Sequence, residues 1–272
     1  MSKEYNEFKE AGTARLSKWM SQAGLCSRRE AEAWIADGRV SVDGSIQTNP
    51  ATVVDDPTRI AVDGKPVNAP MAPRLWKFHK PTGVIVSEGD PEGRKTIFDL
   101  LPKGLPRLMY VGRLDINSEG LLLLTNSGEL KRKLELPATG LARTYRVRMR
   151  GTPTEQEIAQ LAQGMTVDGI DYDPIQASVE RPGTNSWVQV TLHEGKNREI
   201  RHVFEHLGHE VSRLIRTSYG PISLGQLDAR AIREVDKQLM ARYFGFGPKR
   251  KSTWARAKTE DGKRLNRPTR SQ

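Results

Sequence analysis

The chain has 272 residues, of which 36% are hydrophobic, and a formal net charge of +10. This length favours about two domains with a modest core, and the absence of any run of about 18 apolar residues excludes a membrane-spanning helix. Cys26 is the only cysteine, which excludes zinc sites built on cysteine pairs. Because the N-terminus carries no apolar signal segment, we expect a reducing, cytoplasmic location.

The positive charge is concentrated at the C-terminus. Residues 248–272 contain nine basic and two acidic residues, a net charge of +7, which leaves +3 for the rest of the chain. This segment has little apolar content, so we expect a basic disordered tail that either binds phosphates or only aids solubility. Residues 1–12 are expected to form a flexible N-terminus.

A small helix-helix-hairpin module is predicted next. Apolar residues at helical spacing predict a helix over residues 14–23. The sequence Ser-Arg-Arg-Glu at 27–30 is a capping box that begins a second helix, which runs to about Asp37. Residues 39–42 predict a strand, and the Asp-Gly pair at 43–44 predicts that it enters a tight hairpin.

Residues 1–72 hold nine basic and ten acidic groups, so this part of the chain has no excess of positive charge. A basic face on the module would therefore come from the positions of its cations. The candidate RNA contacts are four cations on the two predicted helices, namely Arg15, Lys18, Arg28 and Arg29. The proline-interrupted residues 69–74 predict a linker, so the module spans 13–68 and a second domain spans 75–247.

The second domain is predicted to be α+β, since many strands alternate irregularly with a few helices, which is typical of a mixed or antiparallel sheet. Asn126 is the predicted cap of its second helix. Strands are predicted at 75–78, 84–87, 108–111, 121–124, 144–150, 175–179, 187–192 and 211–216, and helices at 96–101, 129–136, 152–165, 197–207 and 229–244.

An aspartate precedes the most apolar of these strands. The run Leu121–Leu124, bounded by Gly120 and by the turn formers at 126–128, is typical of a short strand buried on both faces. Asp115 therefore lies in a loop that leads into the core. A carboxylate there is costly without a partner or a function, although aspartate in a glycine-containing loop is also a common turn former.

Two further residues are candidates to act with Asp115. Tyr145 lies on the apolar side of the strand 144–150, where it is either a functional group or a core residue with a bonded hydroxyl. Arg201 lies at the edge of the apolar stripe of the helix 197–207, where it is either a surface arginine or a partner that lowers the pKa of Asp115 by about one to three units.

Residues His202–His206 read H-x-x-E-H, a zinc protease pattern, and His209 lies nearby. This short pattern arises readily by chance, and no downstream acidic ligand stands out. We therefore expect no metal, and the chain contains no cofactor fingerprint.

The chain contains four motifs, at 112–126, 143–147, 194–201 and 212–216. In this order they resemble the motifs of the RsuA/RluB family of pseudouridine synthases, except that Arg143 stands where lysine is usual and Ser118 where threonine is common. The N-terminal segment also resembles the small RNA-binding domain first described in a ribosomal protein of the small subunit. With that segment the resemblance covers about residues 11–246.

The resemblance implies that the protein isomerises a uridine within RNA to pseudouridine, without a cofactor. It implies that Asp115 is the essential carboxylate, that Tyr145 stacks on the uracil and helps to remove the carbon 5 proton, and that Arg201 pairs with Asp115. Leu214 would pack on the other face of the base, and Arg113 would fill the space that the flipped base vacates.

The wording of the last two motifs leans towards family members that act on 23S rRNA of the large subunit. The implied partner is ribosomal RNA, either free or in a large-subunit assembly intermediate. We expect the protein to be monomeric and to bind no membrane. The alternative interpretation is a non-catalytic RNA-binding ribosome-assembly factor.

Overall fold

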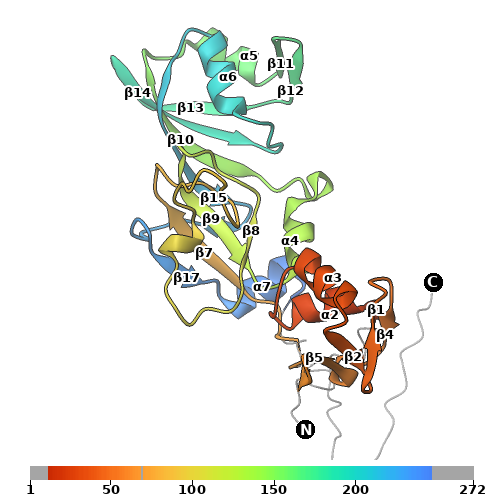
Figure 1. Ribbon diagram of the computed structural model, residues 1–272. Coiled ribbons are helices and arrows are strands. Elements are labelled where there is room, and N and C mark those ends of the chain that lie inside the picture. The colour runs from red at the N-terminus through yellow and green to blue at the C-terminus, as the bar shows by residue number, and fades with distance from the viewer. Residues whose placement is uncertain (1–11, 69, 247–272) are drawn as a thin grey trace, which may run out of the picture.

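The computed structural model describes residues 12–68 and 70–246. The predicted N-terminal segment up to residue 11 and the predicted basic tail at 248–272 lie outside the described residues. Helices and a large mixed sheet confirm the α+β prediction. Figure 1 shows the N-terminal helices at one end of the molecule, near α7 (Lys237–Phe244), with α5 (Glu155–Leu161) and α6 (Glu199–His206) at the other.

The N-terminal part contains two helices on small sheets, as predicted. The predicted capping box is confirmed: Ser27 Oγ accepts from Glu30 N at 3.1 Å, and a Glu30 carboxylate oxygen accepts from Ser27 N at 2.6 Å. The elements are β1 (Ala14–Arg15), α2 (Leu16–Gln22), α3 (Arg28–Ala36), β2 (Val40–Val42), β3 (Ser45–Gln47), β4 (Val53–Val54), β5 (Ile60–Val62) and β6 (Lys65–Pro66).

The first helix begins two residues later than predicted, because Ala14 and Arg15 pair with β4 instead of joining the helix. Arg15 therefore lies on a strand, which corrects its predicted place on a helix. Trp19 is buried between α2 and β4, where its indole N–H donates to the carbonyl of Val54 at 2.9 Å. This bond fixes α2 to β4.

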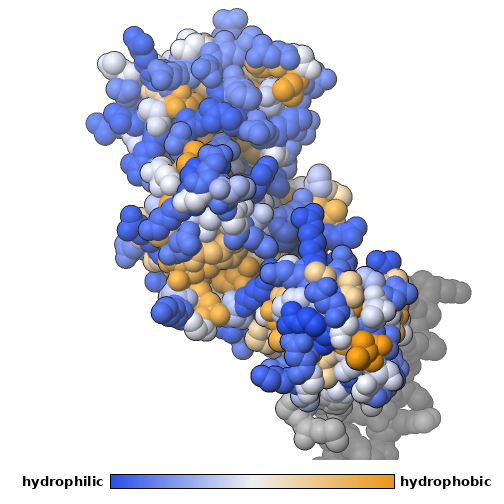
Figure 2. Space-filling view, viewed as in Figure 1, coloured by the Kyte–Doolittle hydropathy of each residue, from blue (hydrophilic) through white to orange (hydrophobic). Residues whose placement is uncertain are grey.

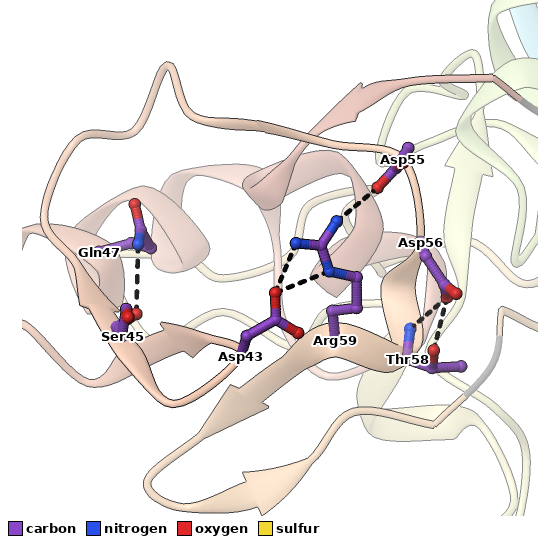
Figure 3. A network of polar contacts seen from close by, with 7 residues as sticks. All are labelled: Asp43, Ser45, Gln47, Asp55, Asp56, Thr58 and Arg59. Carbon is purple, nitrogen blue, oxygen red and sulfur yellow. Dashed lines mark hydrogen bonds and ion pairs between the residues drawn. The ribbon is translucent and has the colours of Figure 1, made fainter.

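Arg59 joins the predicted hairpin turn to a second loop of this part of the chain (Figure 3). Its guanidinium pairs with Asp43, in the turn, and with Asp55 at 2.9 Å. In the same network Asp56 accepts from the backbone N–H and the hydroxyl of Thr58. Exposed pairs of this kind contribute little stability, but they neutralise Arg59 as a site for an external anion.

The large sheet has nine strands. Its main order is β13-β14-β10-β15-β9-β7-β17, and β8 and β16 attach to β9 and β15. Only the β15–β9 pair is parallel among these described strands. The strands are β7 (Leu75–Lys80), β8 (Met109–Val111), β9 (Glu119–Thr125), β10 (Arg143–Arg150), β13 (Gln176–Arg181), β14 (Asn185–Leu192), β15 (Val211–Tyr219), β16 (Ile222–Ser223) and β17 (Ile232–Glu234).

Strand β9 is buried on both faces, as its sequence predicts. Leu122 and Leu124 belong to the core that contains Tyr145 and Leu214, whereas Leu121 and Leu123 pack with α7 and α4 (Gly128–Glu135). The four leucines have no exposed surface. The strand is therefore the shared wall of two hydrophobic cores.

Gly120 permits the close approach of β9 to β15. Its φ is +102°, and a Cβ at this position would lie 2.4 Å from the carbonyl oxygen of Arg216. Residues with a side chain rarely adopt this conformation, and backbone cannot move aside cheaply. The glycine thus allows Arg216 to lie directly beside the end of the Asp115 loop.

Several predicted elements are wrong in extent. Residues 84–87 form no strand, since only Ile85 makes an isolated bridge, with Thr96. The predicted helix over 229–244 is instead β17, which pairs with β7, followed by α7. The helix predicted over 152–165 is α5, which covers only Glu155–Leu161. The helix predicted at 96–101 is a three-residue 3₁₀ turn, Phe98–Leu100.

The prediction that Asn126 caps α4 is wrong, because the hydroxyl of Ser127 caps this helix instead. The Asn126 amide instead accepts from Arg74 N at 2.7 Å and donates to Ala72 O at 3.0 Å. The remaining two short strands are β11 (Met165–Val167) and β12 (Ile170–Tyr172), beside α6.

The surface is mostly hydrophilic on the face that Figure 2 shows, with hydrophobic side chains gathered over the middle of the body. None of the helices within residues 12–68 and 70–246 has the length and apolar character needed to cross a bilayer.

Candidate active site

A cleft of about 660 Å³ opens on the core side of the central sheet. Arg113, Asp115, Tyr145 and Leu214 all line it, so four of the five predicted catalytic and base-binding residues meet at one place. Arg201 does not line the cleft. The cleft walls come from the loop 112–118, from β10 and β15, and from the loop that precedes α6.

Lys80 holds the loop that carries Asp115. Its side chain has no exposed surface, and its ammonium group donates to the carbonyls of Asp115 at 3.0 Å, Ser118 at 2.8 Å and Ile116 at 3.4 Å. A fourth bond joins it to the carbonyl of Pro81 at 3.0 Å. Burial lowers the pKa of Lys80 to about 8, and the Asp115 carboxylate opposes this shift. The turn is therefore wrapped around a buried cation.

Arg201 holds the same loop from the other side. Its guanidinium donates to the carbonyl of Asn117 at 3.1 Å and to that of Val211, in β15, at 2.7 Å. The predicted ion pair between Arg201 and Asp115 is not formed. Backbone carbonyls, which the sequence pattern does not reveal, take the guanidinium instead.

The charges around Arg201 still act on one another. Burial and the neighbouring Arg198 lower the pKa of Arg201, whereas the Asp115 carboxylate acts in the opposite direction. Arg201 therefore lies within the electrostatic field of Asp115 without touching it. Its direct contact with the loop is through the carbonyl of Asn117.

Tyr145 and Leu214 form apolar walls of the cleft, and both are buried. The predicted alternation of β10 is confirmed: Tyr145, Val147 and Met149 are buried, and the arginines between them are exposed. Leu214 of β15 lies opposite Val147, and Arg216 lies opposite Tyr145. The sheet register thus brings the two walls to the same face.

Arg113 lies at the edge of this site. Its side chain is exposed, directly after Gly112, whose N–H donates to the Glu135 carboxylate at 2.7 Å. This bond ties the start of the loop to α4, while Arg113 itself stays accessible at the mouth of the cleft.

Residues that sequence reasoning missed also line the cleft or support it. Lys80 follows Trp76 and Phe78 in the buried phase of β7, and Arg216 follows Leu214 in the buried phase of β15. A basic residue in the apolar phase of a strand is costly unless it has a partner. That signal was present in the sequence, and it distinguishes both residues from the exposed arginines of β10.

Glu199 is a third missed residue. Its side chain is 3% exposed, one carboxylate oxygen accepts from Lys196 N at 3.0 Å, and the other has no partner among the residues described. Burial, and secondly repulsion by Glu194, raises the pKa of Glu199 to about 7. The group therefore changes charge near neutral pH.

The cleft carries more cationic than anionic side chains, which suits a polyanionic ligand. Arg198 adopts a left-handed backbone conformation, with φ of +52°, directly before α6. Such strain at a non-glycine residue often accompanies a functional site. The cations that line the cleft are Arg94, Arg113, Arg143, Lys196, Arg198 and Arg216.

The N-terminal candidate residues form a separate set. Arg15, Lys18, Arg28 and Arg29 are all exposed, and none of them lines the cleft. Within residues 12–68 these four side chains take part in no ion pair, whereas Arg39 is paired with Asp63 and Arg59 with Asp43 and Asp55. Lys65 of β6 is likewise exposed and forms no ion pair, so the predicted contacts on β1, α2 and α3 make up four of the five cations of residues 12–68 that no carboxylate neutralises.

The H-x-x-E-H pattern has a different environment from a metal site. His202 Nδ1 lies 3.3 Å from the hydroxyl of Tyr172. Over the two described ranges, no group of three or more histidine, cysteine, aspartate or glutamate side chains is placed to hold a metal ion.

Comparisons with known proteins agree with this geometry. A model of the RNA pseudouridylate synthase family matches residues 74–206, and a model of the S4 domain matches residues 14–57. The chain is 49% identical over 226 residues to a Rickettsia bellii protein described as an uncharacterized RNA pseudouridine synthase. The matched residues cover 83% of this chain and 98% of that relative.

A second relative and a solved structure extend the comparison. The chain is 41% identical over 232 residues to ribosomal large subunit pseudouridine synthase B of Pseudomonas aeruginosa. The matched residues cover 82% of this chain and 60% of that relative. A crystal structure of a pseudouridylate synthase shares the fold, with a TM-score of 0.61 at 22% identity over 84% of this chain and 99% of its own.

We expect Lys80→Met to lower the free energy of unfolding by about 2 to 4 kcal/mol, because buried carbonyls lose their donor. Chemical denaturation measures the change. The matched control is Lys77→Met on the same strand, whose ammonium group binds two carbonyls at a partly exposed position. Equal losses in the two variants would contradict a special role for Lys80.

We expect Glu199→Gln to change the pH dependence of stability. The raised pKa means that the folded protein binds the Glu199 proton more tightly than the unfolded chain, so this contribution is full below pH 4.5 and is lost as pH rises through about 7. The variant should match wild type at pH 4.5 and exceed it at pH 8 by about 1–3 kcal/mol.

Thermal or denaturant unfolding across this pH range measures the difference. Glu205→Gln, which removes an exposed carboxylate from the same helix, is the control for a general effect of charge. A Glu199→Gln variant that is less stable than wild type at pH 8 would show that the ionised carboxylate has a partner in the fold.

Proposed function

Because this chain belongs to the RNA pseudouridine synthase family, we propose that it isomerises a specific uridine of 23S ribosomal RNA to pseudouridine. The Pseudomonas aeruginosa relative is named as an enzyme of the large ribosomal subunit, which supports the choice of RNA. The observation that carries the proposal is the cleft in which Asp115 faces the same space as Tyr145 and Leu214.

The reaction needs a carboxylate at a fixed position beside an extruded nucleoside. The target uridine leaves its stack at a cost of a few kcal/mol, and stacking on an aromatic side chain returns about 1–3 kcal/mol per base. Tyr145 provides that platform, and Leu214 packs on the opposite face of the uracil. Asp115 then acts on the nucleoside, the C1′–N1 bond breaks, and the base rejoins the sugar through carbon 5.

Arg201 acts as a positioning residue in this proposal. Its bonds to the carbonyls of Asn117 and Val211 join the Asp115 loop to β15, which carries Leu214. The carboxylate and the base-binding wall are thereby held in one frame. Arg113, exposed at the mouth of the cleft, fills the space in the RNA that the flipped uridine leaves.

We assign RNA binding and the reaction to two different parts of the chain. The module 13–68 carries the unpaired cations Arg15, Lys18, Arg28 and Arg29, which bind phosphates and position the RNA without reading its sequence. The domain 75–247, which follows a linker at 69–74, carries out the reaction. The match of the S4 model to residues 14–57 supports this division. The substrate is ribosomal RNA, free or in an assembly intermediate of the large subunit.

We expect Asp115→Asn to abolish the release of tritium from RNA labelled at uracil carbon 5, to less than about 0.1% of the wild-type rate, which corresponds to about 4 kcal/mol in the activation free energy. RNA affinity should stay nearly unchanged. The control is Asp173→Asn, an exposed aspartate outside the cleft, which should retain full activity.

Appreciable turnover by Asp115→Asn would refute the role of this carboxylate. A wild-type protein that binds rRNA but releases no tritium from it would refute the enzymatic proposal and favour a ribosome-assembly factor. Mapping pseudouridines in rRNA from cells with and without the protein would identify the target.

We expect the double variant Arg28→Gln/Arg29→Gln to bind an rRNA fragment more weakly and with a smaller salt dependence, by about one to two in the slope of log K against log salt. Its single-turnover rate at saturating RNA should equal that of wild type. Arg39→Gln is the matched control, because it removes a charge that Asp63 already neutralises. Unchanged affinity and slope in the double variant would show that the module face is not an RNA contact.

A further inference from the structure

One cation of the cleft is buried and has no assigned task. The side chain of Arg216 is 2% exposed and lines the cleft. Its Nε donates to the carbonyl of Leu121 at 2.7 Å, and its guanidinium lies 5.3 Å from the centre of the Tyr219 ring. Its Nη2 is buried and has no hydrogen-bond partner among the described residues.

The fold does not neutralise this charge. In the described part of the chain no carboxylate forms an ion pair with Arg216, although burying an unpaired ion costs several kcal/mol. Arg143, which lines the same cleft, is different: its guanidinium donates to three carbonyls and to the hydroxyl of Tyr219. Arg143 is thus a structural brace, whereas Arg216 keeps a free donor.

The register of the sheet places Arg216 beside the proposed base site. Arg216 and Leu214 lie two residues apart on β15 and face the same side, and Arg216 lies directly opposite Tyr145 of β10. If uracil is stacked between Tyr145 and Leu214, these two side chains cover its faces. The Arg216 guanidinium can then reach only the edge of the ring. The acceptors on that rim are the two carbonyl oxygens, O2 and O4.

We infer that Arg216 donates a hydrogen bond from Nη2 to a carbonyl oxygen of the flipped uracil and stabilises the negative charge that the detached base carries. This inference rests on the proposed function. When the C1′–N1 bond breaks, its electron pair passes to N1 and spreads onto O2 and O4. Carbon 5 then bonds to C1′ with an electron pair of the ring, loses its proton, and N1 gains one, so that the proton count is unchanged.

The symmetry of uracil suits a single fixed donor. The rotation that brings carbon 5 to the place of N1 turns the ring about the axis through N3 and C6, and it exchanges O2 with O4. A donor at one point of the cleft therefore meets a carbonyl oxygen both before and after the rotation. A fixed cation with this geometry holds the base while the bond to the sugar is absent, and a preorganised donor stabilises developing charge without reorganisation.

Single-turnover assays of Arg216→Gln test the inference. We expect the rate of pseudouridine formation to fall about 10²-fold, with RNA affinity nearly unchanged, as for the loss of one donor to a developing anion. The matched control is Arg148→Gln, an exposed arginine on the other face of the sheet, which should leave the rate unchanged.

A second substrate separates charge stabilisation from a structural effect. In RNA with 5-fluorouridine at the target position the detached base is a weaker base, so it needs less help from Arg216. Carbon 5 of this base carries fluorine and has no proton to lose, so the rearranged nucleoside keeps the fluorine and takes up water across N1 and carbon 6. The Arg216→Gln defect in formation of this product should be clearly smaller than the defect in pseudouridine formation from uridine. Equal losses on both substrates, or no loss on either, would overturn the inference.

Arg216→Lys guards against a folding defect, because it keeps the charge and much of the volume. We expect it to unfold at nearly the wild-type temperature and to show a smaller loss, again less with 5-fluorouridine. A wild-type protein without activity would refute the proposed function, whereas active wild type with equally active Arg216 variants would refute this inference alone.

Discussion

The site depends on the buried ammonium group of Lys80. An isolated charge in a core is strongly unfavourable, and here four backbone carbonyls compensate it, three of them from the turn that begins at Asp115. The cation and the turn therefore depend on each other. Without the carbonyls the burial of the ammonium group would be too costly, and without the ammonium group the carbonyls would lose their hydrogen-bond donor. Because Lys80 ends β7, the position of Asp115 follows from the position of the central sheet.

The sheet sets the remaining distances. Gly120 lets β9 approach the backbone of β15 at Arg216, and β15 pairs with β10 at Tyr145. Each of the three strands contributes one part of the cleft, namely the end of the Asp115 loop, the Leu214 wall and the Tyr145 platform. Arg201 closes the frame from α6 through the carbonyl of Asn117. Strands therefore carry Tyr145 and Leu214, and side chains from β7 and α6 hold the loop that carries Asp115.

Local patterns predicted the elements whose environment is local. The leucine run of β9, the alternation of β10 and the capping box at Ser27 all appear as expected, since their periodicity and hydrogen bonds lie within a few residues. The helix predicted over 229–244 was wrong because three of its residues pair with β7, about 150 positions away in the sequence. The predicted Arg201–Asp115 pair was wrong because two backbone carbonyls take the guanidinium instead, that of Asn117 in the Asp115 loop and that of Val211 in β15.

Two of the three residues that were missed share one physical property. Lys80 and Arg216 occupy the apolar phase of a strand, where periodicity alone predicts a hydrophobic side chain. Lys80 carries its charge to the carbonyls of the Asp115 loop, and Arg216 carries its charge to the cleft. Lys80 finds four acceptors, whereas Arg216 finds one and keeps a free donor. That difference separates a structural cation from one that meets a ligand. A base that must turn over while detached needs groups that do not turn with it, and a guanidinium fixed by Leu121 and Tyr219 meets that requirement.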